Sequence, residues 1–168
     1  TNQLVADHID TKMKIIALAQ RYAIGDLSRD MPQLPGEKAE ITETMAAIKR
    51  NLTAISHEIR QLSGAAAAGD FSQRGDESRF EYDFRDMVHN LNTMIETADG
   101  NLSQVSALLQ AIASGDLTVR MDGDFHGVFA TMRDDANATV AQLTSIVERI
   151  QNSASSINTA AGEIASGN

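Results

Sequence analysis

The chain of 168 residues has no cysteine and no tryptophan, and only 4% of its residues are aromatic. Without cysteine it has no disulfide framework, no thiolate metal site and no cysteine nucleophile. It has two prolines, and none of its apolar runs approaches the roughly 18–20 residues of a membrane-spanning helix. Alanine, leucine, isoleucine and seven methionines supply the apolar residues instead. This composition suits narrow seams between helices better than a broad globular core.

The formal net charge is −9, and the sequence contains no basic cluster. These two features argue against nucleic acid or an anionic membrane surface as a main partner. We find no Ser/His/Asp arrangement, phosphate-binding loop or dinucleotide fingerprint, and therefore expect no enzyme, no catalytic residue and no cofactor. The four histidines share no ligand-like spacing, and the acidic residues between 75 and 83 lack the spacing of a calcium loop. We expect no metal site.

A Gly-Asp-hydrophobic tripeptide occurs three times at nearly constant spacing. Each copy ends an apolar, alanine-rich helical stretch and is followed by a polar connector and a second helical stretch. The copies are Gly25-Asp26-Leu27, Gly69-Asp70-Phe71 and Gly115-Asp116-Leu117, which begin 44 and 46 residues apart. An internal repeat of this length determines the architecture before any single residue does.

The helical stretches carry apolar residues at alternating steps of four and three, which is the spacing of a heptad seam. Such seams cover 41–66, 84–112 and 125–164, and two successive four-residue steps interrupt the third near Ala136 and Val140. A weaker first stretch has Val5, Ile9, Met13, Ile16 and Ala23 on one face. Because narrow seams bury little within one chain, and short isolated helices are marginal, we expect two parallel copies to pack together.

The connectors of about 12–15 residues return the chain to the start of the preceding helix, so that the next helix runs parallel to it. Glycine ends each helix because it adopts the left-handed conformation without a Cβ penalty. The hydrophobic residue of each tripeptide then points back towards the helices. Four residues later stand Met31 in the first repeat and Met121 in the third, but Gly75 in the second.

These features together resemble the HAMP domain, the parallel two-helix signalling module of bacterial receptors. The resemblance is strongest over 111–121, and it extends over 66–74 and 22–32. It implies an all-α fold in which two chains form parallel four-helix bundles, stacked end to end and joined by continuous helices. It also implies that the connector and core residues are Gly25, Asp26, Leu27, Met31, Gly69, Asp70, Phe71, Gly115, Asp116, Leu117 and Met121. The family's acidic residue at the start of the second helix would correspond to Glu40, Asp83 and Asp124.

The repeats divide the chain into three HAMP-like units at 1–55, 56–100 and 101–150. The remaining segment, 151–168, resembles the start of the cytoplasmic helical hairpin of methyl-accepting chemotaxis receptors. We therefore expect a signal relay on the cytoplasmic side of an inner-membrane receptor, although a soluble receptor is an alternative. Its partners would be a second copy of itself, an upstream sensor and a downstream signalling domain, and indirectly a histidine kinase and an adaptor.

Two other interpretations of the repeats are open. The chain could be a structural coiled-coil spacer, or it could belong to a histidine kinase or cyclase. Within the relay interpretation, the unequal residues at Met31, Gly75 and Met121 suggest that successive units differ in packing. On this hypothesis Gly75→Met would bias the middle unit and alter the output of an intact receptor.

Overall fold

The computed structural model describes residues 2–167, and these are predominantly helical. The long helices are α1 (Asn2–Ala23), α2 (Ala39–Ala67), α3 (Tyr82–Ala113) and α4 (Val128–Ser166). Two single 3-10 turns, η1 (Gly36–Lys38) and η2 (Glu77–Arg79), precede α2 and α3. Residues 2–167 include no strand. The predicted all-α fold is confirmed.

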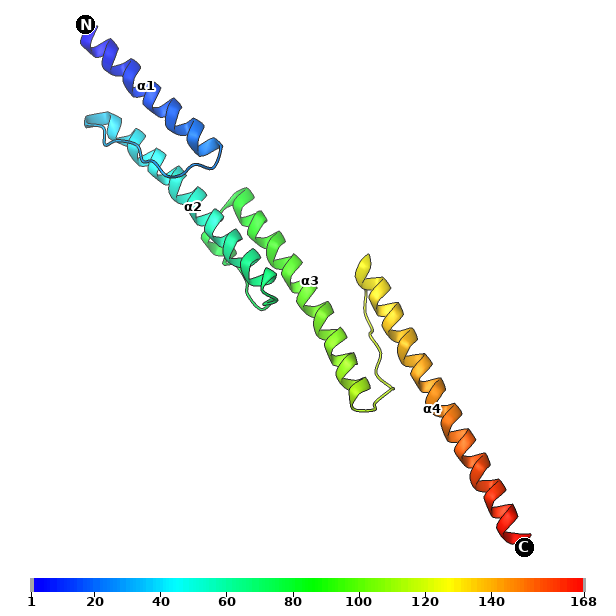
Figure 1. Ribbon diagram of the computed structural model, residues 1–168. Helices are drawn as coiled ribbons and strands as arrows, with labels where there is room; N and C mark the ends of the chain where they lie inside the picture. The colour runs from blue at the N-terminus through cyan, green and yellow to red at the C-terminus, as the bar shows by residue number, and fades with distance from the viewer. Residues whose placement is uncertain (1, 168) are drawn as a thin grey trace. The chain divides into compact units, whose positions relative to one another are not determined.

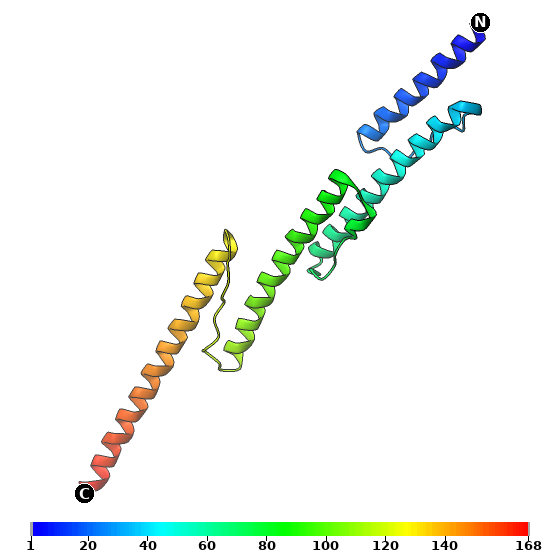
Figure 2. The ribbon, with the colours of Figure 1, turned by 180° about the vertical axis from the view of Figure 1, so that it is seen from behind.

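The chain divides into two compact units, Thr1–Ile95 and Glu96–Asn168, and α3 contributes to both. In the first unit α1 runs parallel to the start of α2, and the start of α3 runs parallel to the end of α2 (Figures 1 and 2). In the second unit α4 runs parallel to the end of α3. Each connector returns along the helix that precedes it, and this return produces a parallel pair instead of an antiparallel hairpin.

Three apolar clusters hold these pairs together, and each contains residues from two helices and the connector between them. The first has Leu18, Tyr22, Met31 and Met45 as its buried members. The second is built on Ile55, Phe80 and Val88. The third is built on Leu108, Met121, Phe125 and Val140. The connectors are therefore part of the core and not loops on its surface.

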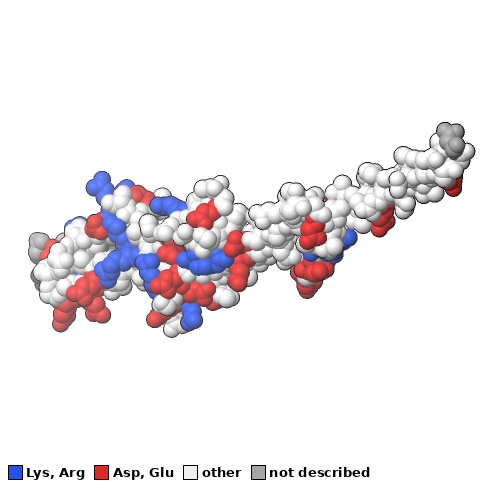
Figure 3. Space-filling model, turned by 90° about the horizontal axis from the view of Figure 1, so that it is seen from below, with Lys and Arg blue, Asp and Glu red and all other residues white. Residues whose placement is uncertain are grey.

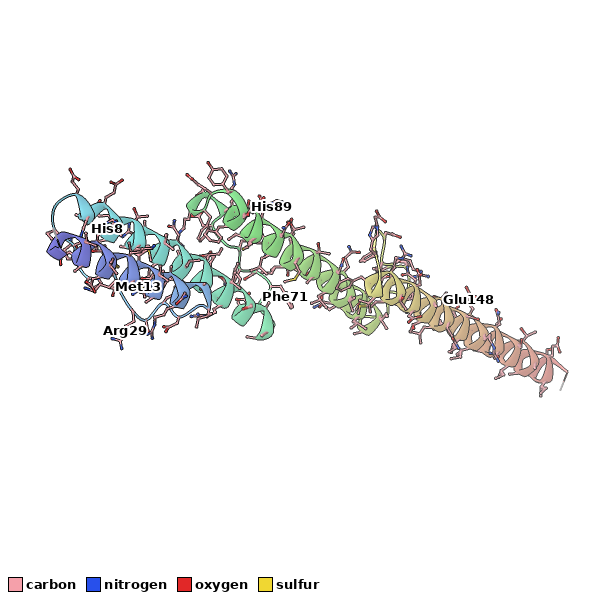
Figure 4. The ribbon with its side chains drawn as sticks, turned by 90° about the horizontal axis from the view of Figure 1, so that it is seen from above. His8, Met13, Arg29, Phe71, His89 and Glu148 are labelled. Carbon is pink, nitrogen blue, oxygen red and sulfur yellow. The ribbon has the colours of Figure 1, made fainter. Side chains whose placement is uncertain are left out.

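The stripe of α1 that packs within the chain lies beside the heptad seam predicted from the sequence. The predicted seam is exposed by 39–58% at Val5, Ile9, Met13 and Ile16, and Figure 4 marks Met13 on this helix. Among the α1 side chains from Val5 onwards, the buried ones are Thr11, Leu18 and Tyr22. The helix has two neighbouring apolar stripes, and one neighbouring helix of the same chain can cover only one of them.

The same choice between adjacent stripes occurs in α3, where the four- and three-residue steps of the predicted seam over 84–112 include Leu109. The side chain of Leu109 is 60% exposed, whereas that of Leu108 is 2% exposed and lies in the third cluster. The predicted start of the last helix was also wrong by three residues. The helix α4 begins at Val128, so Phe125 belongs to the connector.

The part of α4 beyond residue 150 has no cover within the chain. Its isoleucines at 150, 157 and 164 are exposed by 63%, 70% and 72%. Charged side chains are almost absent from this part of the helix, as the face in Figure 3 shows. The segment 151–168 contains a single charged residue, Glu163. An apolar stripe thus runs along a helix face with little charge.

Candidate functional site

The candidate functional site is the set of three junctions in which a helix ends, a connector returns and a second helix begins. Gly25, Gly69 and Gly115 have φ values of 82°, 86° and 82°. In the first junction the amides of Gly25 and Asp26 donate to the carbonyls three and five residues earlier, at 3.0 and 2.9 Å. The other two junctions repeat both bonds with the same lengths. This pair of hydrogen bonds defines the Schellman motif at a helix C-terminus, which requires a residue in the left-handed conformation.

The aspartate after each glycine shapes the first turn of the connector. The Oδ1 atom of Asp26 accepts from the amide of Ser28 at 3.0 Å and from its hydroxyl at 2.6 Å. Asp70 and Asp116 accept in the same way from Ser72 and Thr118. The hydroxyl residue of this turn was not among the residues predicted from the sequence. The signal was present, because all three copies read Gly-Asp-x-Ser/Thr.

These hydrogen bonds lower the pKa of all three aspartates. The hydroxyl and amide of Ser28, and then Arg21, lower the pKa of Asp26 to about 2. A carboxyl with a lowered folded-state pKa stabilises the fold above its unfolded pKa, and this stability is lost as the pH falls from about 4 towards 2. We expect Ser28→Ala to raise the pKa of Asp26 in an NMR titration of the carboxyl carbon.

Ser63→Ala is the matched control for this titration. The Ser63 hydroxyl donates to the carbonyl of Ile59 and contacts no carboxylate among its described hydrogen bonds. The Ser63→Ala substitution should leave the pKa of Asp26 unchanged. An Asp26 carboxyl that titrates near 4 in the unsubstituted chain, or that is unaffected by Ser28→Ala, would contradict the proposed cause.

The apolar residues of the connectors lie where two helices meet, but they are not equally buried. Leu27 and Leu117 are partly buried against the first and third clusters. Phe71, marked in Figure 4, is half-buried in the second connector. The side chains of Met31 and Met121 are 7% and 2% exposed. Both methionines therefore fill the space between the helices of their repeats.

Gly75 occupies the position of these methionines in the second repeat, and there the backbone itself lies between the helices. A Cβ atom placed on Gly75 would lie 2.6 Å from Val88 Cγ1, 3.0 Å from Leu62 Cδ1 and 3.1 Å from Glu58 Oε1. Such distances are below van der Waals contact. A methionine therefore has no space at this position in the observed packing. We therefore expect Gly75→Met to disturb the packing of the second junction, and the hypothesis that it alters the output of an intact receptor stays a prediction.

Two asparagines that the sequence analysis did not single out hold the connector backbone. Asn92 accepts from the amide of Gly75 at 2.7 Å and donates to its carbonyl at 3.0 Å. Asn137 makes the same pair of bonds with Met121, at 2.9 and 3.0 Å. In the first repeat Thr42 has this role, because it accepts from the amide of Leu34 and donates to the carbonyl of Pro32.

A further apolar residue of the second and third connectors also enters the core. Phe80 and Phe125 are both 7% exposed. The guanidinium carbon of Arg79 lies 5.8 Å from the Phe80 ring centre, and that of Arg133 lies 5.9 Å from the Phe125 ring centre. A cation within about 6 Å of a ring face is attracted to it. The second and third connectors thus repeat one arrangement.

Among the described residues, only the second junction has a buried carboxylate between helix and connector. Glu58 of α2 is 8% exposed. Its Oε1 accepts from the amide of Asp76 at 3.1 Å, and its Oε2 lies 3.2 Å from Arg79 Nη1. The equivalent position, eleven residues before the Gly-Asp glycine, is Lys14 in the first repeat and Gln104 in the third.

The three acidic residues expected at the start of the second helices do not share one position. Glu40 and Asp83 lie in the first turns of α2 and α3, and both are exposed. Asp124 lies four residues before α4, with a 94% exposed side chain 3.9 Å from His126. A negative charge within the first turn favours a helix, and Asp124 lies outside that range.

Residues 2–167 contain no group of three His, Cys, Asp or Glu side chains arranged to hold a metal ion. None of the helices in this part of the chain is long and apolar enough to cross a membrane. The distinctive features of the junctions are the helix ends, the side chains that hydrogen-bond to the connector backbone, and the buried apolar side chains. They determine how parallel helices pack.

Comparison with protein families agrees with this geometry. Residues 11–53 match the model for HAMP N-terminal domain 3, and residues 79–145 match the model for the HAMP domain. The chain contains HAMP domains. The first match covers the junction at Gly25, and the second covers the junction at Gly115.

Part of this HAMP-containing chain is similar in sequence to a chemotaxis protein. The chain is 46% identical over 103 residues to methyl-accepting chemotaxis protein McpB of Pseudomonas aeruginosa. The alignment covers 61% of the chain but only 15% of that protein, so the chain corresponds to a small part of its relative. The HAMP matches and this relative support a signal-relay module as the function of the chain.

Proposed function

We propose that the chain is a relay of three concatenated HAMP units, at 1–55, 56–100 and 101–150, in the cytoplasmic part of an inner-membrane chemoreceptor. It works as a parallel homodimer, and residues 151–168 begin the signalling helix. An upstream sensor supplies the input, and the downstream helices control a histidine kinase through an adaptor. The Gly-Asp residues, the connector side chains and the acidic residues Glu40, Asp83 and Asp124 near the starts of the second helices set the helix packing.

The exposed heptad seam carries this proposal. In α2 the buried seam residues Met45, Ile55 and Leu62 alternate with Ile48 and Ile59, which are 41% and 39% exposed. In α4 the exposed isoleucines at 150, 157 and 164 are seven residues apart. Seven-residue spacing keeps side chains on the seam of a coiled coil. A second copy of the chain with the same seam would cover these side chains.

The relay works through helices that are shared by successive units. Helix α2 leaves the first connector and ends at the second, and α3 leaves the second and ends at the third. A change in the rotational phase of one seam is therefore transmitted along the same helix to the next junction. An input shifts the population of two packings only by its differential free energy for them.

Disulfide crosslinking of Ile157→Cys tests the parallel, in-register dimer. The chain has no cysteine of its own, so the background is clean. Ser155→Cys is the control, because residue 155 lies off the seam on the same exposed part of α4. We expect rapid crosslinking of Ile157→Cys and slow crosslinking of Ser155→Cys under mild oxidation.

A different pattern would contradict the dimer. Equal crosslinking of the two variants would mean that no defined seam exists at this level. Absent crosslinking, together with a monomeric mass in solution, would mean that no second chain packs against the isoleucine seam of α4. In either case the relay could not work through paired helices.

A further inference from the structure

The second junction differs from its neighbours in what lies between its helices. The first and third junctions place the buried side chains of Met31 and Met121 there, whereas the second places the peptide backbone of Gly75. Methionine is unbranched and flexible, and it adapts to alternative packings of its neighbours. A backbone segment has no such freedom. The three junctions therefore differ in their capacity to repack.

We infer that the second junction is locked in one packing by Glu58, Gly75 and Asn92, while the junctions of Met31 and Met121 switch. This inference rests on the proposed relay function and specifies where in the chain the change of packing occurs. The middle unit then transmits the input as a rigid coupler between the two units that switch.

Movement of the two helices towards each other at this level is blocked by close contact. The backbone of Gly75 leaves no space for a single additional carbon beside Val88 and Leu62. The side chain of Val88 is fully buried, and that of Leu62 is 2% exposed. Packed cores of this density resist compression and rearrange only by discrete steps.

Movement of α2 away from the connector is opposed by the buried carboxylate. Glu58 accepts from the amide of Asp76 and pairs with Arg79, so separation would break both polar contacts of this buried side chain. A buried charge that loses its hydrogen bonds is strongly unfavourable. The polar contacts therefore oppose separation just as the apolar contacts oppose approach.

The helix α3 is held to the same connector from the other side. Asn92 bonds both the amide and the carbonyl of Gly75, and its Nδ2 also donates to Glu77 Oε1 at 2.9 Å. His89 Nδ1 lies 3.2 Å from Glu77 Oε2. Residues 75–79 thus bond to α2 through one side chain and to α3 through two. The connector fixes the rotational phase of α3 relative to α2.

Methyl relaxation dispersion on the dimeric 168-residue chain tests the lock. The reporters are the methyl groups of Met31, Val88 and Met121, which are buried in the three successive clusters. We expect microsecond-to-millisecond exchange at Met31 and Met121 and none at Val88. Equal exchange at all three reporters, or none at any of them, would overturn the inference.

Glu58→Ala should release the second junction. We expect exchange to appear at Val88, and hydrogen exchange of the Asp76 amide to accelerate about tenfold or more, because it loses a charged acceptor. Glu58→Gln is the milder variant if the alanine chain does not fold, since it retains an acceptor oxygen but not the charge. The control is Glu43→Ala at an exposed position of the same helix.

The locked second junction and the dimeric relay are tested by different measurements. Unchanged exchange at Val88 and Asp76 in both Glu58 variants would overturn the lock even if the chain is a dimer. A monomeric mass and absent crosslinking of Ile157→Cys would overturn the relay. The Asp76 measurement compares bonds within one chain, and therefore reports on the lock whether or not a second chain is bound.

Discussion

Gly75→Met is expected to lower the free energy of unfolding by about 3 kcal/mol, because it overpacks a filled position. The first atom of the new side chain already lies 2.6 Å from Val88 Cγ1. The residues around it come from two helices, so both must move to accommodate the side chain. Urea denaturation followed by circular dichroism measures the change, at a chain concentration that is kept constant between variants.

Gly64→Ala is the control for this substitution. Gly64 lies within α2, and a Cβ atom there has no neighbour within 4 Å. Because alanine has a higher helix propensity than glycine, this variant should be more stable by up to about 1 kcal/mol. If Gly75→Met unfolds at the same urea concentration as the unsubstituted chain, the close packing of the second junction is contradicted.

Phe125→Ala is expected to destabilise the third junction by about 4 kcal/mol. The Phe125 side chain is 7% exposed and packs in one cluster with Leu108, Met121 and Val140. Its removal leaves a cavity between α3 and α4 and takes away the ring beside Arg133. The same urea titration measures this change, and hydrogen exchange of the amides of the start of α4 locates it.

Val128→Ala provides the comparison for Phe125→Ala. Val128 is three residues further along, begins α4 and is 70% exposed. Its truncation should change the free energy of unfolding by less than about 0.5 kcal/mol. A loss of less than about 1 kcal/mol in Phe125→Ala would show that the connector does not contribute to the core of the third junction.

Both predictions concern connectors, and on the inference above the connectors would let one helical repeat serve in two roles. The three helix ends are built alike, with the same glycine conformation and the same aspartate turn. The junctions differ in the residues that lie between the helices and in those that hold the connector. A relay that combines a rigid unit with adaptable ones therefore requires few substitutions within a constant framework.

Features that depend on residues close together in the chain could be predicted from the amino-acid sequence. The three helix ends follow from glycine and from hydrogen bonds that span five residues, so a local pattern is sufficient to predict them. The heptad spacing predicted the helices at 41–66 and 84–112 within the observed bounds of α2 and α3. The parallel direction of the helices followed from connectors too long for a hairpin.

Periodicity alone could not decide which of two adjacent apolar stripes is buried. Leu108 and Leu109 are neighbours in the sequence and equally apolar, yet one is 2% and the other 60% exposed. The choice depends on where the adjacent helix lies, which is a property of the whole chain. For the same reason Phe125 was assigned to a helix instead of to the connector.

Only the tertiary structure identified the polar residues of the junctions. Asn92, Asn137 and Glu58 resemble solvent-exposed helix residues in the sequence, because polarity usually marks the outer face of a helix. Each bonds a connector amide 16–18 residues away. The close packing at Gly75 is likewise invisible in the sequence, because it arises from two helices and a returning connector that meet only in the folded chain.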